Sequence, residues 1–254
     1  MNIKIEDESV VVALTMAAID STVIGSQLYG TANENSDTDT LVVHVDKEML
    51  FETQHQLQYV DSKGNDFMFT SLKKLIANIL SGDQTVTYEA AFNFNGSLAW
   101  LSDFANEGMF DNFKIINAYL GFAKRDIKNF RKKKSAKKLF HIIRGIRTAE
   151  RLLGLHDLDN NEVIALAKKE AVLDANGNDA SLIKNFEDMM IECKTELTNL
   201  LDLGNIELTI SKENAKLLET KYEEFINGYA YTSTEMSVDT SELYYDFQFN
   251  GAKY

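Results

Sequence analysis

Apolar residues follow two different spacings along the chain, and the change falls near Ser71. Before it, short runs rich in β-branched and aromatic residues alternate with polar positions, as is typical of strands. After it, apolar residues recur every three to four positions, as is typical of helices. The pattern predicts an α+β fold: a small mixed β-sheet domain over residues 1–83, then an all-helical domain over residues 84–254 that ends in a mixed polar and aromatic tail.

In the first domain, strands are predicted over residues 21–24, 38–45, 58–60 and 66–70. A helix is predicted over residues 8–19, although its early valines leave a strand open, and residues 47–56 are weakly helical. Ser71 is a suitable N-cap for the next helix and Gly82 a suitable stop. Later helices are predicted over residues 84–92, 97–106, 111–133, 135–154, 160–171, 179–203 and 211–228, with a further strand or a packing segment in the tail.

Composition narrows the class of protein. The chain is 44% hydrophobic, enough for a buried core, and Cys193 is its only cysteine, which excludes an intrachain disulfide. It has no run of about 18 apolar residues and its N-terminus is acidic, so we expect no membrane span, no signal peptide and a cytoplasmic location.

Charge is unevenly distributed. The net charge is −13, yet the segment from Lys124 to Arg151 carries twelve Lys and Arg against two acids, a net +10 that leaves −23 elsewhere. A solvated basic helix beside an acidic neighbour explains this segregation, and so does a surface that binds phosphate groups.

Two acids stand where the predicted strand over residues 38–45 begins. Asp37 and Asp39 would share one face, roughly 6 to 7 Å apart at the backbone, and Asp66 opens the strand over residues 66–70. Carboxylate oxygens suit Mg²⁺, and paired metal ions stabilise the attacking and leaving oxygens of phosphoryl transfer. Asp66 is a candidate either for holding a metal or for activating the attacking hydroxyl.

A glycine turn precedes these acids. The predicted strand over residues 21–24 ends at Gly25-Ser26, and a helix start follows. Backbone amides at such a turn, together with the Ser26 hydroxyl, can hold the phosphates of a nucleotide.

The whole combination resembles the DNA polymerase β-like nucleotidyltransferase superfamily: Gly25-Ser26, a ten-residue spacer, Asp37-Thr38-Asp39, and Asp66 on the following strand. The segment GSQLYGTANENSDTDT is similar to a branch of predicted bacterial and phage nucleotidyltransferases that carries Gly-Ser-x-x-Tyr-Gly before Ser-Asp-x-Asp. Two later segments, DFMFTSLKKLIANILSGDQTVTYEAAF and LFHIIRGIRTAERLLG, extend the resemblance to about residues 20–155.

The resemblance implies a nucleotidyltransferase domain over residues 1–83 and a helical substrate-binding domain over residues 84–254. Such an enzyme moves a nucleoside monophosphate from a nucleoside triphosphate such as ATP to a hydroxyl acceptor and releases pyrophosphate. The catalytic residues, which would also bind Mg²⁺ or Mn²⁺, would be Asp37, Asp39 and Asp66. The nucleotide would be bound by Gly25, Ser26, Tyr29 and Ser36, with Tyr29 open to stacking on a base or to packing.

A row of cationic residues marks the predicted helix over residues 135–154. His141, Arg144, Arg147 and Arg151 are three or four residues apart and therefore lie close to one face. Arg144 and Arg147 are predicted to bind the nucleotide; the alternative is pairing with acidic helices. The acceptor is open among an RNA end, a protein hydroxyl and a small molecule, with RNA slightly favoured by the basic segment 124–138. The oligomeric state is open as well.

Two other classes of protein compete with the enzyme. One is a non-catalytic, antitoxin-like regulatory protein on the nucleotidyltransferase fold. The other is an acidic helical interaction protein in which the motif is accidental. Metal binding would distinguish the interaction protein from the enzyme and the regulatory protein. Turnover would distinguish the enzyme from the regulatory protein.

Overall fold

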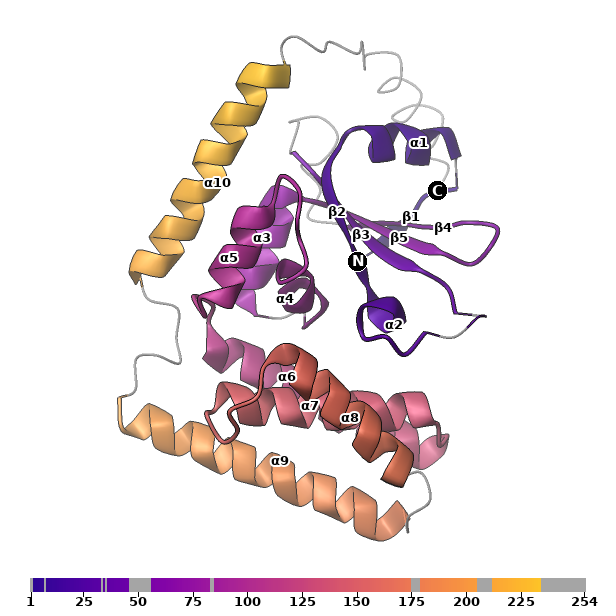
Figure 1. Ribbon diagram of the computed structural model, residues 1–254, viewed down its shortest axis with the longest axis vertical. Coiled ribbons are helices and arrows are strands. Elements are labelled where there is room, and N and C mark those ends of the chain that lie inside the picture. The colour runs from indigo at the N-terminus through magenta and orange to yellow at the C-terminus, as the bar shows by residue number, and fades with distance from the viewer. Residues whose placement is uncertain are drawn as a thin grey trace. The chain divides into compact units, whose positions relative to one another are not determined.

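The computed structural model describes residues 2–6, 8–32, 34, 36–45, 56–82, 85–174, 179–204 and 212–233 of the 254-residue chain. Its fold is α+β, as predicted, with a five-stranded mixed sheet near the N-terminus and helices through the rest (Figure 1). The weak helix expected over residues 47–56 falls outside the described residues except for Gln56, and so does the tail after Ser233. None of the helices described is long and apolar enough to cross a membrane.

The sheet has the strand order β1-β4-β5-β3-β2. Its strands are β1 (Asn2–Lys4), β2 (Ala18–Ile24), β3 (Asp39–His44), β4 (Gln56–Val60) and β5 (Asp66–Ser71). The central pair β3 and β5 is parallel, whereas β2 runs antiparallel to β3 and β4 antiparallel to β5. The predicted strands are confirmed, and β1, which pairs in parallel with β4, was not predicted because three residues are too few to show a period.

One face of the sheet packs against α1 (Glu8–Met16). Val11 and Leu14 of the helix lie in one buried cluster with Val42, Leu57 and Phe69 of the strands. The helix stops at Met16, short of the predicted end, because the chain pairs as a strand from Ala18 onward. Since side chains alternate along a strand, the neighbours of these residues in sequence point to the opposite face of the sheet.

The helices after the sheet follow the predicted period. They are α3 (Leu72–Ser81), α4 (Thr85–Ala91), α5 (Ala99–Asn106), α6 (Asn112–Lys132), α7 (Ala136–Leu152), α8 (Asn160–Asp174), α9 (Asp179–Asp202) and α10 (Lys212–Ser233). Side-chain caps fix four of the starts. Ser71 accepts the Lys74 N–H at α3, as predicted, and Asp111, Ser135 and Asp159 cap α6, α7 and α8 in the same way. Helices α6, α7, α8 and α9 pack together, as Figure 1 shows.

The chain divides into two compact units, but not by a single cut at residue 83. The sheet unit contains Met1–Asn78, Glu89–Gly108 and α10, and the helical unit contains Ile79–Tyr88 and the chain from Met109 through α9. Long-range contacts explain the return of later segments to the sheet unit. The Asp20 carboxylate accepts the Leu98 N–H at 2.8 Å, and the rings of Trp100 and Phe225 lie 6.4 Å apart. Local periodicity does not show such contacts.

His44 ends β3 inside the core, 1% exposed, with its ring 5.8 Å from that of Phe69. Burial lowers the pKa of His44 from 6.5 to about 4, against the opposite effect of a hydrogen bond with the Ala17 backbone. The unfolded chain therefore binds this proton at a higher pH than the folded chain does. Folding stability should fall by on the order of 3 kcal/mol as the pH drops from about 6.5 to about 4.

Urea unfolding at the two pH values checks this expectation. His44→Leu should show a smaller loss of stability between them than the wild type, because the variant has no imidazole to protonate at this position. An equal loss in both proteins would show that His44 is not the group responsible.

Candidate active site

The site is built around the turn that ends β2. Gly25 has φ +65°, a conformation that favours glycine. A Cβ added at this position would collide with Oδ2 of Asp39 and lie 3.1 Å from its carboxyl carbon. Position 25 therefore favours glycine for two reasons: its positive φ and the close approach of the Asp39 side chain. The Asp39 carboxylate lies directly against the turn.

Asp66 lies beside Asp39 on the neighbouring strand. The two residues are register partners in the parallel pair β3 and β5, and the Asp66 N–H donates to the Thr38 carbonyl at 3.0 Å. Partners on adjacent strands are about 4.8 Å apart, with their side chains on one face. This is the face opposite α1, since Val42 and Phe69 face the helix. Two half-buried carboxylates thus stand side by side next to the Gly25 turn.

Gln58 on β4 contacts this pair and was not predicted from the sequence. Its Nε2 donates to Asp66 Oδ2 at 2.5 Å. Asp66 Oδ1 is buried and has no hydrogen-bond partner among the described residues. Such oxygens are normally satisfied by water, an ion or a ligand. The sequence carries no signal for it, because Gln58 stands at a polar position of the alternating strand QLQYV, opposite in face to Leu57 and two residues before Val60, the register partner of Asp66.

The donor set fits Mg²⁺. That ion binds through one or two carboxylates and completes its shell with water and substrate phosphates. Asp39 and Asp66 offer one carboxylate each that could hold such an ion. Asp37 is exposed in the segment before β3, and no group of three His, Cys, Asp or Glu side chains in the described part of the chain is placed to hold a metal. The metal and catalytic roles of Asp37 therefore stay a prediction.

Hydrogen bonds of the residues after Gly25 stabilise the turn. Helix α2 (Gly25–Leu28) is a single turn, and the half-buried Ser26 accepts the Thr31 N–H through its carbonyl at 2.9 Å. Tyr29 is only 5% exposed and its hydroxyl donates to Glu89 on α4. Of the two roles left open for Tyr29, this burial favours packing over stacking on a base.

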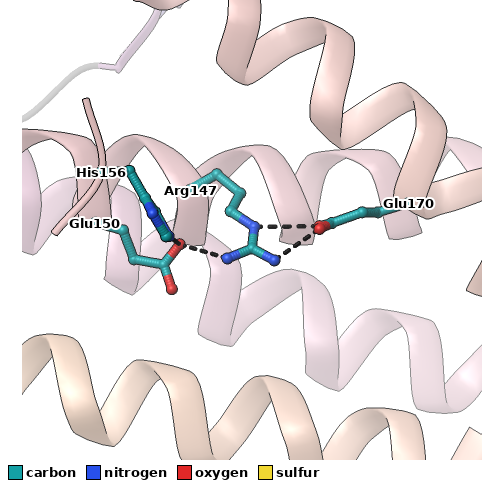
Figure 2. Close-up of polar contacts among 4 residues, drawn as sticks. All are labelled: Arg147, Glu150, His156 and Glu170. Atoms are coloured by element: carbon teal, nitrogen blue, oxygen red, sulfur yellow. Dashed lines mark hydrogen bonds and ion pairs between the residues drawn. The ribbon is translucent and has the colours of Figure 1, made fainter. Parts of the chain in front are cut away.

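The arginines predicted to bind the nucleotide have partners inside the helical unit. Arg144 is 3% exposed, with its guanidinium carbon 6.0 Å from the centre of the Tyr119 ring. Arg147 donates from Nε and Nη2 to Glu170 at 3.2 and 2.7 Å and from Nη1 to Glu150 at 2.8 Å, as Figure 2 shows. Arg147 thus pairs with acidic residues, which was the alternative to nucleotide binding. The structure gives no support for nucleotide binding by Arg144 or Arg147.

His156 joins the same group. Its Nε2 lies 3.4 Å from Glu150 Oε2, on the side away from Arg147 (Figure 2). Ser36, the remaining predicted nucleotide contact, is half-buried in the segment before β3.

No protein-family model and no curated protein matches this chain.

The close approach of Asp39 to Gly25 predicts a specific cost for a methyl group. Gly25→Ala should lose about 1 to 2 kcal/mol of unfolding free energy through the left-handed backbone alone. Displacing the Asp39 carboxylate should add about 1 to 3 kcal/mol. Gly64→Ala is the matched control, because Gly64 has φ +91° and no atom within 4 Å of an added Cβ. Equal losses in urea unfolding would contradict the contact with Asp39.

The hydrogen bond from Gln58 predicts a combined effect on stability and activity. Gln58→Leu leaves Asp66 Oδ2 without its donor, which should cost about 1 to 3 kcal/mol of unfolding free energy. Loss of a residue that orients a metal-binding carboxylate should also weaken Mn²⁺ binding about 10- to 100-fold, measured by calorimetry. Unchanged Mn²⁺ affinity in a destabilised variant would reduce Gln58 to a structural residue.

Proposed function

We propose that this chain is a nucleotidyltransferase that moves a nucleoside monophosphate from a nucleoside triphosphate to a hydroxyl acceptor. The observation that carries this is the Asp39 carboxylate held against the positive-φ Gly25, with Asp66 in register on the next strand. The resemblance of the Gly25 to Asp39 segment to DNA polymerase β-like nucleotidyltransferases supports the same activity.

In the transfer, an oxygen of the acceptor hydroxyl forms a bond to the α-phosphorus. The bond from that phosphorus to the oxygen bridging the α- and β-phosphates breaks, and pyrophosphate leaves. Bound Mg²⁺ would neutralise the charge that develops on the phosphate oxygens. Asp39 and Asp66 would hold that ion, with Asp37 as a third predicted ligand.

The chain's own groups orient the reactants. The backbone of the Gly25-Ser26 turn lies close enough to Asp39 to place a triphosphate beside the ion that Asp39 holds. Asp66 offers Oδ1, because Gln58 already donates to Oδ2. This one oxygen can bind the ion or accept the proton of the attacking hydroxyl.

The test is incubation of the full chain with nucleoside triphosphates labelled at the α-phosphate, with Mg²⁺ or with chelator. Separate reactions offer cellular RNA, cellular protein and small hydroxyl compounds as acceptors. Label should enter one pool only when Mg²⁺ is present. Nucleotide binding without transfer to any pool would instead support the regulatory protein on the same fold. Failure to bind either metal or nucleotide would exclude both.

A further inference from the structure

We propose that α6 presents a docking surface for the phosphodiester backbone of a nucleic-acid strand, which makes that strand the acceptor. The surface centres on Lys124, Lys128 and Lys132, here called the lysine stripe. The identity of the acceptor rests on the proposed function, whereas binding of the strand does not.

The geometry of α6 places the stripe on one face. Its members are four residues apart, and four residues are close to one helical turn. The side chains of all three are exposed, and none forms a hydrogen bond or ion pair within the part of the chain that the structure describes. Their Cα atoms span about 12 Å along the helix. Lys133 and Lys137, also exposed, extend the positive charge around the connection to α7.

Acidic neighbours do not neutralise this surface. Asp126, the one acid in the sequence of α6, pairs with Arg125 at 3.6 Å, and Glu187 of α9 pairs with Arg131 of α6 at 2.6 Å. Burial first, and then the charges of Arg144, Lys137 and Arg125, lower the pKa of His141 on α7. Positive charge therefore acts on the helix beside α6 as well.

Helix stability does not account for the stripe. Like charges four residues apart destabilise a helix, and the favourable effect of a cation at a helix C-terminus reaches only the last turn. That effect covers Lys132 but not Lys124 or Lys128. Lys137 stands in the first turn of α7, where a cation is unfavourable. Local helix stability thus gives no reason for the stripe, whereas binding of an anion does.

The partner is a polyanion rather than a membrane or an apolar protein surface. An interfacial helix inserts an apolar face, but the apolar face of α6 is in the core of the helical unit, including Ile116, Tyr119 and Ile127. No large hydrophobic side chain of α6 or α7 is among those exposed. Several unpaired lysines without an apolar anchor match a phosphate backbone, which RNA and DNA share.

Fluorescence anisotropy with short end-labelled RNA and DNA single strands tests this on the full chain, without nucleotide or metal. Binding through five lysines predicts that the association constant falls about 100-fold between about 50 and about 200 mM salt. Reversal of the stripe, Lys124→Glu with Lys128→Glu and Lys132→Glu, should reduce that dependence to about 7-fold. At the lower salt concentration, the triple variant should bind the strands at least about 10-fold more weakly than the wild type does.

The matched control reverses Lys169, Lys194 and Lys216, three exposed lysines on other helices, and brings the net charge from −13 to the same −19. It should bind nearly as wild type. Equal losses in both triple variants, or no binding of either strand by the wild type, would overturn the docking surface. Preference for one strand identifies the acceptor class.

Failure of this surface and failure of the proposed function are distinguishable. Asp39→Asn should bind the strands as the wild type does, because the change leaves every lysine of the stripe in place. Transfer of label to protein or to a small molecule, with no strand binding, would leave the function standing and remove the surface. Strand binding without transfer of label would leave the docking surface standing and remove the proposed function.

Discussion

Asp39→Asn is expected to reduce the rate of nucleotidyl transfer at least about 100-fold, the equivalent of about 3 kcal/mol in transition-state stabilisation. An amide of the same shape keeps the contact with Gly25 but loses the charge that would hold Mg²⁺. Asp39 is half-buried at the start of β3 rather than in the core, so the fold should persist. Initial rates with α-labelled nucleotide at saturating Mg²⁺ measure the effect, and Asp66→Asn should behave alike.

Asp103→Asn is the control for this prediction. Asp103 is an exposed carboxylate of α5 in the same unit, and its side chain has no polar partner among the described residues. The change has the same chemistry and the same effect on net charge, yet transfer should be unaffected. A rate for Asp39→Asn within about twofold of the control would remove Asp39 from the chemistry.

Arg147→Met is expected to lower the free energy of unfolding by about 3 to 5 kcal/mol, because it leaves two carboxylates without their common partner. The side chain of Glu150 is 9% exposed and that of Glu170 is 26% exposed. Both would then have to remain charged with little water, or take up protons. Urea unfolding measures the loss.

Arg131→Met is the matched control for the half-buried Arg147. Arg131 pairs with Glu187 at 2.6 Å, but the two side chains are 52% and 46% exposed. Its loss should cost less than about 1 kcal/mol, as for other surface ion pairs. Losses of similar size in the two variants would show that the network of Figure 2 contributes no more than a surface pair.

Much of the fold could be predicted from the sequence because it depends on local periodicity. Strands β2, β3 and β5 and the long helices α6 and α7 follow from alternation and the 3.6-residue period, and Ser71 caps α3 as predicted. The return of Glu89–Gly108 and α10 to the sheet unit could not, since it depends on contacts such as that of Asp20 with Leu98 across 78 residues.

The candidate site shows the same division. The spacing from Gly25 to Asp39 identified the turn and the carboxylate that prove to be in contact. Gln58 was missed because its importance comes from strand pairing, which places it diagonally across from Asp66. The roles expected for Arg144 and Arg147 came from their shared helical face alone. A face does not reveal whether the neighbouring helix offers a carboxylate, as α8 does with Glu170.

Parallel reactions with the same nucleoside triphosphate, labelled either at the α- or at the γ-phosphate, test the central claim most directly. Nucleotidyl transfer through Asp39 and Asp66 breaks the bond between the α-phosphorus and the bridging oxygen. The account therefore predicts that α-label enters the acceptor and γ-label is released in pyrophosphate, in equal amounts and only with Mg²⁺. Entry of γ-label into the acceptor, or its release as free phosphate while α-label stays in a nucleoside diphosphate, would contradict it.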